Sequence, residues 1–116
     1  MQYMLLIYTA DSTGPVPGTA EFGAMMQGYE NFGEETGAAG VFVAGDALQP
    51  VSTATSVSVR NGQAQVTDGP FAETKETLGG YYLLDCKDLE EAQAYAAKIP
   101  SAAYGTIEVR PVMIFD

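Results

Sequence analysis

Short apolar runs alternate along the chain with segments of helical periodicity, and both kinds of pattern end at glycine or proline. The apolar runs are rich in aromatic and β-branched residues, which is typical of strands. Asn61-Gly62 lies between SVSVR and QAQVT and is a strong β-hairpin signal. Strands are therefore predicted at residues 2–9, 41–45, 56–60, 63–67, 80–86 and 106–115.

The segment after Thr19 predicts a first helix. Its apolar positions are separated by steps of three and four, which place them on one helical face. Thr19 is a suitable N-cap, and Gly37 and Gly40 are expected to end the helix. The face consists of Phe22, Met25, Met26, Tyr29, Phe32 and Thr36.

A second helix is predicted from Asp88, which serves as its N-cap. Glu91 occupies the capping-box position, and Pro100 is expected to end the helix. The buried stripe is predicted to consist of Leu89, Ala92, Ala96 and Ile99.

This order of elements predicts a ferredoxin-like α+β domain over residues 1–116, with two helices on one face of an antiparallel sheet. The other sheet face would be bare, yet YMLLIY, VFVA and YYLLD are apolar on both of their faces. In an antiparallel sheet with one solvent-exposed face, apolar and polar residues should alternate along each strand. We therefore expect a homodimer with two sheets face to face; a strand-edge contact or a loop lying on the sheet is the alternative.

The composition narrows the classes of partner. Five basic residues stand against fifteen acidic ones, and the net charge of −10 argues against direct binding of nucleic acid. No apolar stretch is long enough for a membrane span, and MQYMLLIYTAD is interpreted as a first strand rather than a signal peptide. A single cysteine, Cys86, fits a reducing, cytoplasmic location and is expected to be a small buried hydrophobe.

The chain contains no histidine. This excludes Ser-His-Asp and Cys-His catalysis as well as histidine-ligated metals. Acid–base chemistry would have to use carboxylates, tyrosines, lysine or the thiol. Neither a metal nor a cofactor is expected.

Several segments together resemble the DGPF subgroup of the YCII-related family, and the resemblance covers nearly the whole chain. They are MQYMLLIY, VFVAGDALQP, VTDGPFAETKETLGGYYLLD, the DLEEA helix, IPSAAYGTIEVRP and the closing strand. The resemblance implies a dimeric α+β barrel. It also implies a gene position often beside extracytoplasmic-function sigma factors. Some relatives carry a His–Asp pair proposed as catalytic, and this chain could supply only the aspartate, with Asp68 as the candidate.

The segment from Asp68 to Phe71 has both a structural and a functional interpretation. Asp-Gly-Pro is turn chemistry, in which the aspartate caps backbone N–H groups and the glycine takes a positive φ. Alternatively, Asp68 is a carboxylate at the mouth of a cleft, with its pKa raised by Phe71 and neighbouring acids. The two interpretations are compatible.

Lys75 lies between Glu73 and Glu76 in a charge run that is typical of a solvated turn. Lys75 could instead be drawn inward and donate a hydrogen bond to an anionic ligand. Gly79-Gly80 opens the next strand, where glycines permit a bulge or the close approach of another backbone.

Aromatic residues on the strands offer a further set of candidates. Tyr81 and Tyr82 are adjacent, so they point to opposite faces, and Tyr3 and Tyr8 divide in the same way. Packing in the core or in the dimer interface is their default role. A hydroxyl group facing the barrel could instead orient a small aromatic or carbonyl ligand.

Glu108 and Arg110 share one face of the last strand, and the apolar residues of that strand occupy the other. A charge on the barrel face needs a partner, so a salt bridge within or between subunits is one interpretation. In the other, Arg110 anchors a ligand carboxylate. Asp46 is a candidate partner for either residue.

Three functions remain open. The first is a protein that binds a small organic molecule in a cleft near the DGPF segment, with Tyr8, Asp46, Phe71, Lys75, Tyr81 and Arg110 as candidate ligand-binding residues. The second is a cofactor-free lyase or hydrolase with Asp68 as the acid or base. The third is an interaction module linked to sigma-factor regulation.

Overall fold

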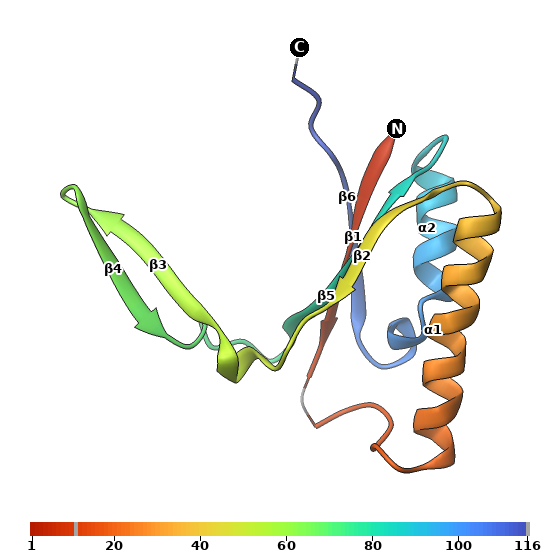
Figure 1. Cartoon of the computed structure of the whole chain (residues 1–116), viewed down its shortest axis with the longest axis horizontal. Coiled ribbons are helices and arrows are strands. Elements are labelled where there is room, and N and C mark those ends of the chain that lie inside the picture. The colour runs from red at the N-terminus through yellow and green to blue at the C-terminus, as the bar shows by residue number, and fades with distance from the viewer. Residues whose placement is uncertain (11, 116) are drawn as a thin grey trace.

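A computed structural model describes residues 1–10 and 12–115 and contains a four-stranded antiparallel sheet in the order β2-β5-β1-β6. Both helices cover one face of this sheet (Figure 1), which confirms the predicted ferredoxin-like α+β class. The elements are β1 Gln2–Thr9, α1 Ala20–Ala38, β2 Phe42–Ala47, η1 Val51–Thr53, β3 Thr55–Arg60, β4 Gln63–Asp68, β5 Thr77–Asp85, α2 Leu89–Lys98, η2 Pro100–Ala103 and β6 Thr106–Pro111.

Both helices begin where their capping residues predict. The Thr19 hydroxyl accepts a hydrogen bond from the backbone N–H of Phe22 at 3.2 Å. The Asp88 carboxylate accepts from the N–H of Glu91 at 2.9 Å, and the Glu91 side chain accepts from the N–H of Lys87. Side chains thus satisfy N–H groups that a helix start would leave free.

The core lies between the helices and the sheet. Its largest fully buried side chains are those of Leu5, Leu84, Ile99, Thr36 and Cys86, which confirms the expectation for Cys86. Phe32 of α1 packs its ring against Tyr82 of β5, with 4.7 Å between the ring centroids. The prediction for Leu89 was wrong, because its side chain is 44% exposed. Leu89 is the first residue of α2, and the buried stripe begins one turn later, at Ala92.

The opposite sheet face carries mainly apolar side chains. Strand register aligns Leu6 with Tyr81 on one side and Glu108 on the other. Met4 is aligned in the same way with Leu83 and Arg110. Both helices lie on the other side of the sheet (Figure 1). No helix of the described residues covers this face, which is here called the open face.

Strands β3 and β4 form a separate two-stranded sheet, here called the arm. Asn61 and Gly62 have φ angles of 52° and 76°, as the predicted hairpin turn requires. The arm extends away from the sheet on the side opposite the helices (Figure 1). The radius of gyration is 16.2 Å, whereas a compact domain of 100 residues has about 13 Å.

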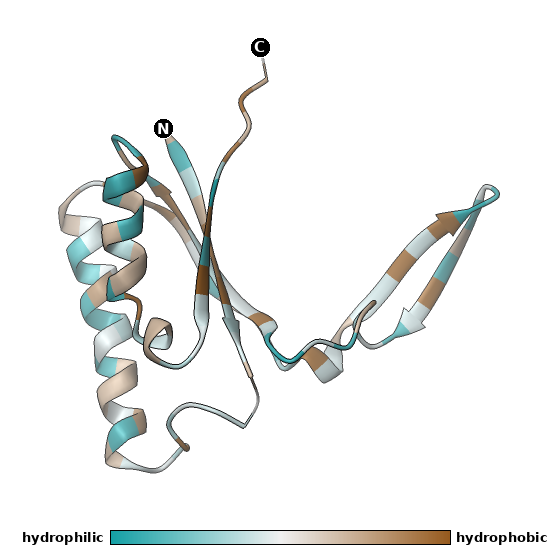
Figure 2. Ribbon diagram, turned by 180° about the vertical axis from the view of Figure 1, so that it is seen from behind, coloured by the Kyte–Doolittle hydropathy of each residue, from teal (hydrophilic) through white to brown (hydrophobic). Residues whose placement is uncertain are grey.

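The last strand is shorter than the predicted 106–115. Val112 still donates its N–H to the carbonyl of Gln2 at 2.9 Å, but Gln2 is the first residue of β1. The chain then runs past its partner strand and protrudes (Figure 2). Met113, Ile114 and Phe115 are consequently exposed.

Candidate functional site

Two hollows lie at the end of the sheet where the arm is attached. The loop-side cleft has a volume of about 600 Å³ and is lined by Tyr8 and by residues 48–51, 53–56, 70–72, 74 and 76–78. The helix-side cavity has a volume of about 340 Å³ and lies between α1, η2 and the ends of β2 and β5. Both volumes fall in the range of small-molecule sites.

The DGPF segment forms one wall of the loop-side cleft. Gly69 has a φ of +100°, as the turn interpretation requires. Its N–H donates to the carbonyl of Ala54, and its carbonyl accepts from the Ser56 hydroxyl, both at 2.7 Å. These bonds tie the segment to the base of the arm and fix the position of the residues that follow.

The predicted site residues of this segment have different positions. Phe71 lines the cleft and is 95% exposed. Asp68 is an exposed residue at the end of β4, opposite Thr55, and it lines neither hollow. Lys75 is exposed and also lies outside both linings, whereas Glu76 lines the cleft. Of the predicted residues, the cleft therefore brings together Tyr8 and Phe71.

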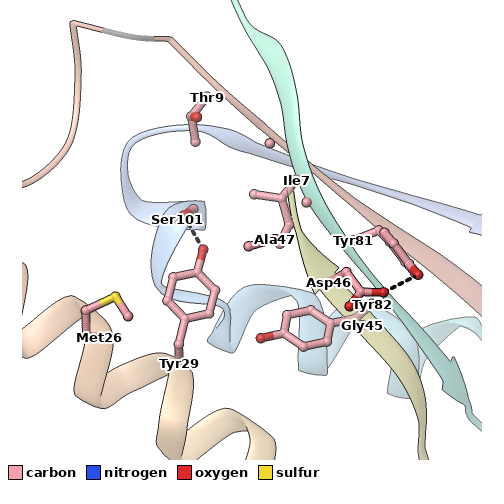
Figure 3. Close-up of a pocket in the computed structure, with 12 residues that line it drawn as sticks. Ile7, Thr9, Met26, Tyr29, Gly45, Asp46, Ala47, Tyr81, Tyr82 and Ser101 are labelled. Atoms are coloured by element: carbon pink, nitrogen blue, oxygen red, sulfur yellow. Dashed lines mark hydrogen bonds between the residues drawn. The ribbon is translucent and has the colours of Figure 1, made fainter. Parts of the chain in front are cut away.

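Asp46 and Tyr81 are cross-strand neighbours on β2 and β5. The Tyr81 hydroxyl donates to the Asp46 carboxylate at 2.7 Å. This hydrogen bond, together with the negative charge of Asp46, raises the pKa of Tyr81. Both residues contribute to the lining of the helix-side cavity, but their bonded side chains point to the other side of the strands from Tyr29 and Tyr82 (Figure 3).

Within one chain Arg110 lies far from Asp46, so these two residues do not form the suggested pair in the same subunit. Strands β5 and β1 separate β2 from β6, and three strand spacings amount to roughly 14 Å. Glu108 and Arg110 do share the open sheet face, as predicted. The ion pairs among the described residues are Lys98–Glu35 and the amino group of Met1 with Asp85.

Gly79 and Gly80 produce the predicted bulge and close approach. The β1–β5 register aligns Ile7 with Gly80 but Tyr8 with Leu78, so Gly79 is the extra residue. A Cβ atom on Gly80 would lie 3.0 Å from the carbonyl oxygen of Asp46. Both glycines line the helix-side cavity, which is therefore close to bare backbone on this side.

The walls of the helix-side cavity include residues that the sequence analysis assigned to the core. Tyr29 of α1 and Tyr82 of β5 both line it, and the Tyr29 hydroxyl shares a hydrogen bond with Ser101 of η2 (Figure 3). Burial raises the pKa of both tyrosines. The participation of Ser101 had no signal in the sequence, because this residue is 72 positions from Tyr29.

The described residues give no indication of a metal centre. No cluster of three or more histidine, cysteine, aspartate or glutamate side chains that could hold a metal occurs within residues 1–10 and 12–115. Burial raises the pKa of the Cys86 thiol, which does not favour the reactive thiolate.

Within residues 1–10 and 12–115, no helix has the length and apolar character needed to cross a membrane.

Comparison with known proteins gives two matches. The YCII-related domain matches residues 1–116 of the chain. A protein of Rhizobium meliloti (strain 1021), named uncharacterized protein R00369, is 43% identical over 70 residues. That match covers 59% of this chain and 56% of the relative, so it spans little more than half the length of either protein.

Proposed function

The chain belongs to the YCII-related family, and we propose that this member binds a small organic molecule in the loop-side cleft. The observation that supports the proposal is the cleft itself, with a volume of about 600 Å³ between Tyr8 and Phe71. A phenylalanine that is 95% exposed is costly in water, and a ligand that covers it would recover part of that cost.

The lining indicates the class of ligand. Pro50, Val51, Pro70 and Phe71 offer apolar surface, and several threonine and serine hydroxyls offer hydrogen bonds. Glu76 is the only charged residue among the described residues that line the cleft. The ligand is therefore an apolar organic molecule whose polar group is neutral or positively charged, because a carboxylate would meet Glu76 without a compensating cation.

The proposal extends to the DGPF subgroup and to a second copy of the chain. Residues 68–71 have the sequence Asp-Gly-Pro-Phe, which is the motif of the DGPF subgroup. The open sheet face carries the apolar side chains of Met4, Leu6 and Leu83. Across a two-fold axis, Glu108 of each chain can meet Arg110 of the other, since both lie on this face. Such a homodimer would cover the open face and supply the partner charges that the described chain lacks.

We assign no catalytic role to Asp68, because it is exposed and lines neither hollow. The loop-side cleft also brings together no nucleophile with a base in hydrogen-bond reach among its described lining residues.

A matched series of probes tests the proposal. Benzylamine, benzyl alcohol and benzoate have the same ring and differ in charge, and their binding can be followed by NMR titration of the labelled protein. We expect benzylamine to bind most tightly, benzyl alcohol less tightly and benzoate not at all. Phe71→Ala should weaken benzylamine binding about tenfold or more, because it removes the apolar surface of one aromatic side chain.

Phe115→Ala is the matched control, since Phe115 is also an exposed phenylalanine, at 84%, but lies outside the cleft. This variant should bind benzylamine as the wild type does. Equal losses in both variants, or benzoate binding as tightly as benzylamine, would contradict the proposed site.

A further inference from the structure

We infer that the helix-side cavity is a second, separate binding site, which takes a small uncharged aromatic molecule carrying a hydroxyl or carbonyl group. The cavity lies on the helix-covered side of the sheet, and its lining shares no residue with that of the loop-side cleft. The two sites therefore differ in both their walls and their chemistry.

The shape of the cavity suits a single planar ring. Its volume is about 340 Å³, near the lower end for small-molecule sites. Gly79 and Gly80 leave one side without side chains, while Tyr29, Tyr82 and Met26 supply flat or flexible apolar surface. A ring between two tyrosines gains from offset or edge-to-face packing, and a methionine thioether adapts to the edge of a ring.

The hydroxyl groups of the cavity differ in whether they already have a hydrogen-bond partner. The Tyr29 hydroxyl is bonded to Ser101, and the Ser101 hydroxyl also lies 3.5 Å from that of Tyr104. The Tyr82 hydroxyl has no hydrogen-bond partner among the described residues, although this side chain is partly buried. Figure 3 shows this hydroxyl on the side of the ring that faces α1. A ligand oxygen could accept its hydrogen bond.

The charges around the cavity exclude an anion. Asp46 is the only charged residue among the described residues of the lining, and its carboxylate is occupied by Tyr81. Burial and the neighbouring Tyr29 raise the pKa of Tyr82, so its hydroxyl stays protonated and neutral at physiological pH. A carboxylate in the cavity would have no cation to pair with.

Methionine labelling tests this site directly. With ¹³C-methyl methionine, Met26 reports on the cavity, and the methionines away from it serve as references in the same spectrum. We expect phenol to shift the Met26 signal in a saturable way and benzoate to leave it unchanged. Tyr82→Phe keeps the ring and removes one hydrogen bond, so it should weaken phenol binding about fivefold.

Two variants make the result specific. Tyr95→Phe removes the hydroxyl of another partly buried tyrosine next to Phe32, which lines neither hollow, and should leave phenol binding unchanged. Phe71→Ala should also leave it unchanged, because Phe71 belongs to the loop-side cleft. The inference is overturned if phenol shifts all methionine signals alike without saturation, if Tyr82→Phe binds as the wild type does, or if benzoate binds equally.

Discussion

Gly80 shows how closely the backbones pack where the arm leaves the sheet. The position of a Cβ atom added to Gly80 is 3.0 Å from the carbonyl oxygen of Asp46, whereas one added to Gly79 has only the Thr9 hydroxyl, at 3.9 Å. We predict that Gly80→Ala lowers the free energy of unfolding by about 1–3 kcal/mol, because the backbone must shift. Urea denaturation measures the change. Gly79→Ala is the matched control and should be neutral within about 0.5 kcal/mol; equal losses would contradict the role of close approach.

Two partly buried tyrosines, Tyr29 and Tyr82, predict a loss of stability at high pH. Burial raises the pKa of Tyr29 and Tyr82 above the ordinary value of about 10. The native state therefore holds protons that the unfolded chain releases above that pH, so stability is intact below pH 10 and falls as pH rises. In Tyr82→Phe the fall should be shallower, as measured by urea denaturation between about pH 9 and 11. If the free energy of unfolding of the variant fell with pH as steeply as that of the wild type, the pKa of Tyr82 would not be raised in the native state.

At the scale of single residues, the sequence predicted interactions between close neighbours. Thr19 and Asp88 cap their helices, and Gly69 takes a positive φ, because each depends on residues within three positions. The sequence did not predict that Tyr29 meets Ser101, or that Asp46 bonds Tyr81 rather than Arg110. Those contacts depend on strand order, which brings distant segments together.

At the scale of elements, the arm is the clearest difference between expectation and structure. Its strands and turn were predicted, but their separation from the main sheet was not. The alternation of apolar and polar residues is the same in a free hairpin and in a hairpin that belongs to a larger sheet. Val57 and Val66 form a cross-strand pair on one face and are 62% and 65% exposed. A two-stranded hairpin with a bare apolar face is marginally stable alone. The arm extends on the side where the second copy is proposed (Figure 1).

The arm should therefore contribute to dimerisation rather than to folding of the single chain. The double variant Val57→Thr, Val66→Thr should raise the dimer dissociation constant severalfold, because apolar area is lost from the contact. Analytical ultracentrifugation measures that constant. Gln65→Thr, on the opposite arm face, is the control and should have no effect. A double variant that dimerises as the wild type does would show that this face is not part of the contact.

At the scale of the whole molecule, strands that are apolar on both faces indicated a covered sheet, and the register now identifies the face concerned. We predict by light scattering a particle of twice the chain mass of 12.2 kDa at micromolar concentration. Leu6→Asp, on the open face, should reduce it to one chain, since it would bury a charge. Leu89→Asp, at an exposed leucine of α2, should leave the dimer intact. A wild-type mass of one chain would contradict the homodimer.

The most direct test of the proposed function is a crystal structure of the protein soaked with benzylamine at ten times its measured dissociation constant. We expect electron density for the ring in the loop-side cleft, against Phe71 and Tyr8, with the amine directed toward Glu76. Density for the ligand elsewhere, or an empty cleft at that concentration, would contradict it.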